Sequence, residues 1–321
     1  MRFRLHPLRL RFTALEPVHF AIGQSTNILR GAFGTTLRRI ACEPQCPGVH
    51  DCPRRASCPY GRLFKPSSLA PGPSGFGDRP RPFVFRATHL DGLTIPSGAA
   101  FHFDLNLFDT ASADINSLAA AFAELAREGL GPGRGKVELT QVSQSHGVTL
   151  EPLELSLDPP AKPVSRLLVR FITPTELKCG GQIAAQPDFG ILAARVRDRI
   201  GTLSELYGDG PLPIDFRGFG ERAALVRMKR CEIRTVVRSR RSSRTGQVHS
   251  TGGFVGEAEY EGELTEFIPF LKAASWTGVG RQTVWGKGQI EVEGPSLLAT
   301  GCGEPTVCTS CVVGPEDNSS E

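Results

Sequence analysis

Two glycine-rich segments with interspersed basic residues are the first candidates for chemistry. One runs from Gly129 to Lys136 and the other from Gly278 to Gly288. Repeated glycines can turn backbone N–H groups toward an anion, and the basic side chains between them add positive charge for several phosphates in a row. The loop residues that we expect to contact such a ligand are Arg134, Lys136, Gly278, Gly280, Arg281, Gly286, Lys287 and Gly288.

Neither segment is a nucleotide-binding loop of a familiar kind. The fixed four-residue gap and the Lys-Ser/Thr ending of a P-loop are missing from both. Neither follows a first strand and opens a helix, as a dinucleotide-binding fingerprint does. Glycines also mark ordinary turns, so a flexible turn is the alternative for each segment.

The helix expected after Ser25 carries a third candidate surface. Steps of 100° per residue place one set of residues on a single face, opposite the apolar stripe. Two exposed glycines cost this helix roughly 1 kcal/mol each relative to alanine, which the close approach of another backbone would offset. That backbone is either a nucleic acid or a neighbouring part of the protein. The residues on this face are Asn27, Arg30, Gly31, Gly34 and Arg38.

A one-sided basic run spans residues 227 to 244. It holds eight arginines and lysines against the single acid Glu232, and it continues with a composition typical of a hairpin loop. A solvated face is the alternative, but this arginine-rich hairpin favours nucleic-acid binding. Few aromatic residues accompany it, so backbone and shape contacts are expected rather than base stacking. The expected contacts are Arg238, Arg240, Arg241 and Arg244.

Four of the nine cysteines lie within seventeen residues. Cys42, Cys46, Cys52 and Cys58 have the spacing C-x3-C-x5-C-x5-C. Four thiolates can hold a structural zinc ion, which would order a loop too polar to fold by burial. Free thiols are the equal alternative, and an iron–sulfur cluster ranks below both. Three further cysteines, Cys302, Cys308 and Cys311, are expected to be free thiols in a disordered tail.

Strand and helix patterns follow one another in an order that occurs twice. Residues 8–14 alternate between apolar and polar, and the helix of residues 25–40, strands at 83–87 and 101–107, a helix at 112–128 and a strand at 137–142 follow. The second half repeats the order with segments 167–172, 189–207, 224–237, 254–260, 264–274 and 284–292. This predicts an α+β protein of two tandem ferredoxin-like (βαββαβ, RRM-like) domains, with a glycine-rich loop before the last strand of each.

Composition agrees with two domains of ordinary size. The chain has 321 residues, of which 40% are hydrophobic and 22% charged, and this excludes wholesale disorder. No apolar run is long enough for a membrane span or a secretory signal, so a cytoplasmic location is expected. We expect one domain over 1–156 with a cysteine-rich insertion, a second over 157–294, and an acidic, disordered tail over 295–321. Without the four acids of that tail, the formal charge of +4 becomes +8.

Several of these motifs together resemble a known family. They are Leu29 to Gly34, Cys58-Pro59-Tyr60 with Leu63-Phe64, Gly252 to Gly256, and Gly278-Val279-Gly280-Arg281 through Trp285 to Gly288. Over residues 8–292 the chain is similar to the CRISPR repeat-processing endoribonucleases of the RAMP superfamily, the Cas six family. The resemblance implies a prokaryotic protein that cleaves precursor crRNA within each repeat, without a metal, to leave a 2′,3′-cyclic phosphate and a 5′-hydroxyl.

The resemblance also implies a proton-transfer group in or just after the first helix. Many relatives place a histidine directly after the second glycine of the Arg-Gly-x-x-Gly motif, and this chain has Thr35 there. His50 is the first substitute, with Arg38, Arg39 and Tyr60 as electrostatic or proton-transfer partners. The implied partners are CRISPR repeat RNA and other CRISPR effector subunits; neither membrane nor DNA is expected. No cofactor is expected for catalysis. The alternative function is a non-catalytic RAMP-type subunit that only holds crRNA in an effector complex.

Overall fold

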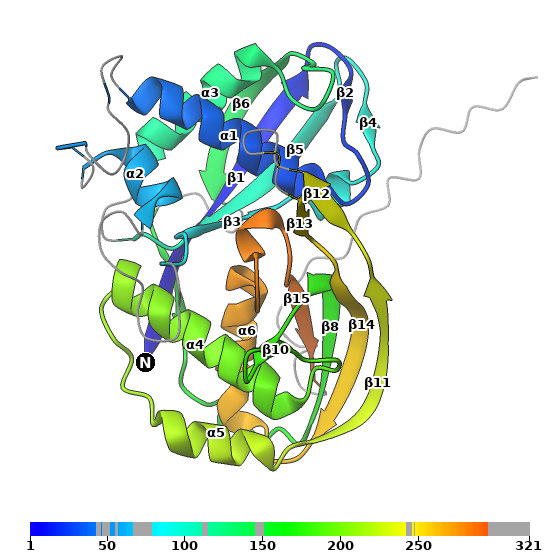
Figure 1. The fold of residues 1–321 in the computed structure, drawn as a ribbon. Helices are drawn as coiled ribbons and strands as arrows, with labels where there is room; N and C mark the ends of the chain where they lie inside the picture. Colours follow the sequence, from blue (N-terminus) through cyan, green and yellow to red (C-terminus); the bar gives the residue numbers. More distant parts are fainter. Residues whose placement is uncertain are drawn as a thin grey trace, which may run out of the picture.

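A computed structural model describes residues 1–42, 46, 52–54, 57–66, 79–110, 115–144, 151–241, 246 and 248–294. The chain forms two halves, each built from an antiparallel sheet with helices packed on it (Figure 1). The expected class, a mixed α and β protein with antiparallel sheets, is confirmed. Within the described ranges, no helix has the length and apolar character needed to cross a membrane. The cytoplasmic location stays a prediction.

The N-terminal half contains a sheet with the strand order β3-β5-β1-β6, and β7 pairs with the beginning of β1. Its strands are β1 (Arg2–Ala14), β3 (Phe83–Arg86), β5 (Ala100–Leu107), β6 (Val137–Gln144) and β7 (Leu153–Ser156). Its helices are α1 (Ser25–Ala41), α2 (Pro59–Phe64) and α3 (Ile115–Glu128). The short strands β2 (Val18–His19) and β4 (Thr94–Ile95) pair with each other, and the 3-10 turn η2 (Thr88–Leu90) precedes β4.

The C-terminal half contains a sheet with the order β11-β14-β8-β15. Its strands are β8 (Arg166–Thr175), β11 (Arg227–Val236), β14 (Gly253–Glu261) and β15 (Ile290–Glu293). Its helices are α4 (Phe189–Tyr207), α5 (Phe216–Ala224) and α6 (Ile268–Thr277), with 3-10 turns η3 (Thr265–Phe267) and η4 (Thr283–Trp285). Two small hairpins extend from it, formed by β9 (Lys178–Cys179) with β10 (Gln182–Ile183) and by β12 (Ser239–Arg241) with β13 (Val248–Ser250).

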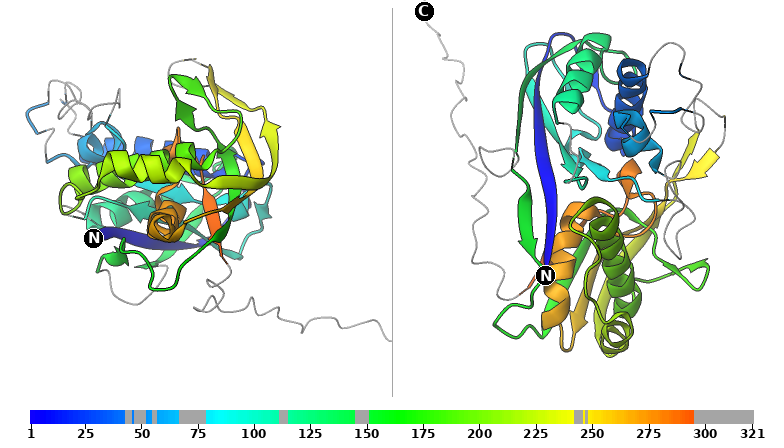
Figure 2. Two further views of the ribbon diagram at one scale, coloured as in Figure 1. Left: turned by 90° about the horizontal axis from the view of Figure 1, so that it is seen from below. Right: turned by 90° about the vertical axis from the view of Figure 1, so that its left-hand side faces the viewer.

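Strand β1 belongs to both hydrophobic cores. Its alternating pattern buries Phe3 and Leu5 in the C-terminal core and Leu8, Leu10 and Phe12 in the N-terminal core. The strand begins beside α6 and runs up along the N-terminal sheet (Figure 2). It starts six residues before the predicted position, at Arg2. A single long strand therefore joins the two halves mechanically.

The predicted last strand was wrong at its beginning. We expected it from Val284, but residues 283–285 form η4 and the strand starts at Ile290. Gln282 and Gly286 have left-handed backbone angles, with φ of 60° and 88°, which no strand accommodates. The turn sends Val284 into the N-terminal core, where it is buried. The glycine-rich loop of one half is thus packed into the other half.

Three side chains fix the end of α6, where this loop begins. The last turn of a helix leaves four carbonyls without partners inside the helix. Arg86 Nη2 donates to the carbonyls of Ser275 and Trp276 at 2.9 and 3.0 Å, and Asn106 Nδ2 also donates to Trp276 O at 2.9 Å. Arg199 Nε donates to Thr277 O at 2.9 Å. Since Arg86 and Asn106 lie on β3 and β5, the N-terminal half holds the start of the C-terminal loop.

The two arginines of this contact are strongly desolvated. Burial lowers the pKa of Arg86 to about 10. Burial lowers the pKa of Arg199 to about 9, and the neighbouring Arg86 charge lowers it further. The negative end of the α6 dipole and its carbonyls offset this cost, because both guanidinium groups face the C-terminus of the helix.

Candidate nucleic-acid interface

The start of helix α1, the base of the β12–β13 hairpin and the loop of residues 278–288 meet at one pocket of about 250 Å³. Asn27 lines it from α1, Arg238 from the base of the hairpin, and Trp285 and Lys287 from the loop. The hairpin is close to the N-terminal half here, because a Cβ on Gly23 would lie 1.7 Å from Arg238 Nη1. Three regions that the sequence marked separately as RNA-binding candidates therefore form one surface.

Most backbone N–H groups of the second glycine-rich loop are already used within the protein. The N–H groups of Val279, Arg281 and Gly288 donate to Gly288 O, Glu176 O and Pro174 O at 2.8, 3.1 and 3.1 Å. Those of Gly278, Trp285 and Gly286 also donate to backbone carbonyls. These six N–H groups are therefore not available to an anion, contrary to what we expected of this loop. Its glycines permit a tightly packed turn, so its RNA contacts, still a prediction, would come mainly from side chains.

Lys287 is not on the surface, contrary to expectation. Its side chain is 3% exposed, and Nζ donates to Glu176 Oε2 at 2.7 Å and to Gln282 Oε1 at 3.1 Å. Burial lowers the pKa of this ammonium group, and the bond to Glu176 opposes the shift. Arg281 keeps half of its side chain exposed, with Nη1 3.8 Å from Glu176 Oε2. Arg281 is thus the cation that this loop offers to a ligand.

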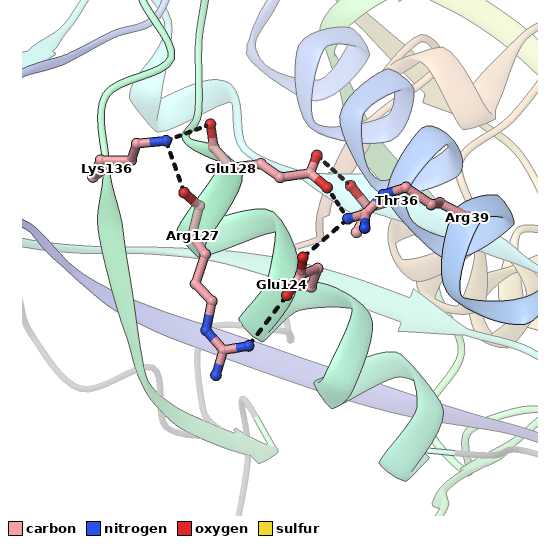
Figure 3. Close-up of polar contacts among 6 residues, drawn as sticks. All are labelled: Thr36, Arg39, Glu124, Arg127, Glu128 and Lys136. Atoms are coloured by element: carbon pink, nitrogen blue, oxygen red, sulfur yellow. Dashed lines mark hydrogen bonds and ion pairs between the residues drawn. The ribbon is translucent and has the colours of Figure 1, made fainter.

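In the first glycine-rich loop, Lys136 supports the fold. Its Nζ donates to the carbonyls of Arg127 and Glu128, at 2.8 and 3.1 Å, and so caps the C-terminus of α3 (Figure 3). Gly135 lies against the β1–β2 connection, where a Cβ would come within 2.3 Å of Pro17 O. Packing of a turn therefore explains the glycine at position 135. Arg134 is exposed and is the remaining candidate contact here.

Arg39 is engaged in an ion-pair network between α1 and α3. Its Nη2 pairs with Glu124 Oε1 at 3.1 Å and with Glu128 Oε1, while Thr36 Oγ1 donates to Glu128 Oε2 at 3.1 Å (Figure 3). The hydrogen bond to Glu124 and the charge of Glu128 raise the pKa of Arg39. Arg38 and Arg39 are both exposed, but a catalytic role for Arg39 requires this ion-pair network to open.

The exposed face of α1 divides into a packed part and an open part. Gly34 lies against α2, where a Cβ would be 2.7 Å from Phe64 Cε1, and the Arg30 guanidinium lies 5.2 Å from the centre of the same ring. Tyr60 stacks on Phe64 with 5.4 Å between the ring centres. A Cβ on Gly31 would meet nothing within 4 Å. Protein packing therefore explains Gly34 but gives no reason for glycine at position 31.

We expect Gly31→Ala to stabilise the protein and to weaken RNA binding. Alanine in an open helix position raises the free energy of unfolding by about 0.5–1 kcal/mol. A methyl group between α1 and an RNA backbone should reduce affinity about tenfold, which corresponds to 1.4 kcal/mol. Chemical denaturation and equilibrium RNA binding measure the two effects. Gly34→Ala is the matched control, because its clash with Phe64 should lower stability instead. Unchanged RNA affinity of Gly31→Ala would remove this face from the interface.

Several candidates fall outside the described part of the chain. His50 and Arg244 lie there, and nothing is described of the side chains of Arg240 and Arg241. Their roles stay predictions. The backbone of the β12–β13 hairpin does place residues 240 and 241 beyond Arg238 on the same arm.

The four clustered cysteines are described and none forms a disulfide. Burial raises the pKa of the Cys42 thiol, with smaller contributions from Cys46 and Cys58 in the same direction. Among the described residues, no group of three or more potential ligands is arranged to hold a metal ion. Cys302, Cys308 and Cys311 lie outside this part. Structural zinc remains a prediction that metal analysis of the purified protein can check.

Two acidic residues of the site were missed by sequence reasoning. Asp91 caps α1 in place of a residue at the helix start, because its Oδ1 accepts from Ser25 N at 3.0 Å and from Ser25 Oγ at 2.5 Å. Glu176 neutralises Lys287. Each acts on a partner far away in the sequence, so no local pattern could have indicated it.

Residues 169–290 match the family model described as CRISPR-associated endoribonuclease Cas6, and residues 3–155 match an N-terminal domain model, AF_1859_N. The predicted resemblance to the Cas six family is thereby confirmed.

Solved structures agree on the fold. The product complex of Cas6 (TTHB231) from Thermus thermophilus is 19% identical, with a TM-score of 0.56 over 90% of this chain and 99% of that one. The product complex of Cas6 (TTHA0078) is 21% identical, with a TM-score of 0.50 over 91% and 100%. A partial Cas6-RT-Cas1–Cas2 complex is 9% identical, with a TM-score of 0.54 over 92% of this chain and 46% of that chain. A comparison with the curated proteins finds no match.

Proposed function

We propose that this protein is an endoribonuclease that binds CRISPR repeat RNA and cleaves precursor crRNA within the repeat. One observation carries the proposal: in a chain whose residues 169–290 match the Cas6 family model, the first turn of α1, the base of the arginine-rich hairpin and the glycine-rich loop converge on a single pocket. Within the described part of the chain, the positive charge for the RNA backbone would come from Arg38, Arg134, Arg238 and Arg281. Association with other CRISPR proteins is part of the proposal and awaits a test.

The strand orders of the two sheets support two tandem ferredoxin-like domains. In each half, the first and third strands of a βαββαβ unit are neighbours at the centre of the sheet, and the second and fourth lie at its edges. We infer that each half is a ferredoxin-like domain, with a boundary near residue 157. The glycine-rich loops then occupy the same place in each half, between the second helix of the unit and its last strand.

The proposed reaction is an internal transesterification. The 2′-hydroxyl oxygen upstream of the scissile phosphate bonds to phosphorus, and the bond from phosphorus to the 5′-oxygen breaks. A base takes the 2′-hydroxyl proton, an acid protonates the departing 5′-oxygen, and cations stabilise the charge on the phosphate. No metal is needed for this sequence of events. His50 is our candidate for proton transfer, with Arg38, Arg39 and Tyr60 as partners.

Incubation with repeat RNA in EDTA tests the function. We expect cleavage at one position in the repeat, with a 2′,3′-cyclic phosphate on one product and a 5′-hydroxyl on the other. A 3′-hydroxyl with a 5′-phosphate, formed only after a divalent metal is restored, would contradict the proposal. Tight binding with no product would favour the alternative, a non-catalytic subunit that holds crRNA.

The variant His50→Ala tests the proton-transfer group. We expect single-turnover cleavage to slow by roughly a hundredfold or more, with affinity for the repeat within a few-fold of wild type. His89→Gln is the matched control, since His89 is an exposed histidine of the same half that we place outside the catalytic machinery. If His50→Ala cleaves at the wild-type rate, the role passes to Arg38, Arg39 or Tyr60.

A further inference from the structure

One residue that lines the pocket carries an unused hydrogen-bond acceptor. Asn27 Oδ1 is buried and has no hydrogen-bond partner in the described part of the chain. Asn27 stands on the first turn of α1 and lines the pocket together with Trp285 from η4. A buried acceptor without a donor is unfavourable in the free protein, so a ligand that supplies the donor gains correspondingly on binding.

The charges around the pocket do not suit a phosphate. Asp91 lines the pocket with a carboxylate that would repel an anion. The buried ammonium of Lys287 is already paired with Glu176. Arg238 remains as a cation of the lining, which also contains the anionic Asp91. A neutral ligand with both donors and acceptors therefore fits better than an anionic one.

The size and walls of the pocket suit one flat ring system. Its volume of about 250 Å³ is below the range of roughly 300–1,000 Å³ typical of sites for drug-sized ligands. Trp285 is the aromatic residue of the lining, and base stacking on an aromatic ring contributes substantially to single-strand binding. An asparagine amide pairs with the edge of a nucleobase, as acceptor through Oδ1 and as donor through Nδ2.

We propose that this pocket receives a single unpaired nucleobase of the repeat RNA, whose edge is read by the amide of Asn27 and whose face packs on Trp285. The proposal rests on the proposed function, because it requires that the chain binds repeat RNA. It adds a position of base-specific contact to a surface that otherwise recognises the RNA backbone. Asn27 is then a specificity residue and takes no part in the chemical step.

An abasic scan of the repeat tests the pocket. Each nucleotide is replaced in turn by an abasic site in RNA that also carries the 2′-deoxyribose expected to block cleavage, and equilibrium affinity is measured. For the wild type, we expect one unpaired position at which the loss of the base costs roughly tenfold or more in affinity. Asn27→Ala should bind intact RNA about tenfold more weakly and should show little further loss at that position. Asn116→Ala, which alters an exposed asparagine on α3, should behave as the wild type does.

The outcomes separate this proposal from the one it rests on. If the wild type binds the repeat but no abasic position stands out, the pocket proposal is overturned and the proposed function is not. If Asn27→Ala retains the full abasic penalty, another residue reads the base and the assignment fails. No binding of intact repeat by the wild type overturns both. Removal of an unpartnered acceptor should leave folding intact, which thermal unfolding checks, and the wild-type scan decides the pocket should Asn27→Ala not fold.

Discussion

Repeat RNA with one 2′-deoxyribose directly upstream of the scissile phosphate is expected to remain uncut and to bind with unchanged affinity. The proposed nucleophile is the 2′-hydroxyl of the RNA itself, and without it no bond to phosphorus can form. Phosphate and base contacts are the same in both RNAs, so binding should not distinguish them. Single-turnover cleavage and equilibrium binding of the two RNAs measure the two quantities separately.

The position of the substitution provides the control. A 2′-deoxyribose on the downstream side of the scissile phosphate leaves the nucleophile in place, and this RNA should be cut at the normal rate. Cleavage of the upstream-substituted RNA would identify water as the nucleophile. That result would exclude transesterification whatever the outcome of the variants of His50.

Gly288→Ala is expected to lower the free energy of unfolding by about 2–4 kcal/mol. We also expect the variant to lose RNA affinity at moderate temperature, because the loop no longer holds its shape. Gly288 has a φ of 70°, and a Cβ there would lie 1.9 Å from Val279 O. This carbonyl belongs to a residue that itself bonds to Gly288, since Val279 N donates to Gly288 O at 2.8 Å. The clash therefore falls on the hydrogen bond that closes the loop. Chemical denaturation and RNA affinity report both effects.

Gly133→Ala is the matched control in the other glycine-rich loop. A Cβ on Gly133 would meet nothing within 4 Å, and its φ is not in the left-handed region. We expect a change in stability of a few tenths of a kcal/mol or a small gain. Equal losses for Gly288→Ala and Gly133→Ala would contradict the steric account of the loop.

Local patterns were sufficient to predict most of the elements. The alternation in β1 and the apolar stripe of α1 both follow from the burial of one face, which a single segment reveals. Helix α5 was not expected, since residues 216–224 carry two glycines and an exposed Phe216. The last strand was placed too early because the left-handed angles of Gln282 and Gly286 depend on packing in the other half.

The candidate site was harder to predict, for a physical reason. A lysine or glycine in a loop has the same local pattern whether it faces a ligand or a part of its own protein. Lys287 is neutralised by Glu176, which lies 111 residues away, and Gly34 is explained by Phe64 on a different helix. A Cβ on Gly31 would meet nothing within 4 Å, so RNA contact at this position stays a prediction. Long-range partners decide which candidates remain.

The hydrogen bonds at the end of α6 determine whether the two halves can be separated. A fragment limited to residues 157–294 would contain the Cas6-matching part, yet the carbonyls of Ser275 and Trp276 would lose Arg86 and Asn106. Val284 would also lose the core that buries it. The glycine-rich loop is therefore not a portable module: its shape is encoded by both halves, and transfer of the loop to another protein would require transfer of β3 and β5 as well.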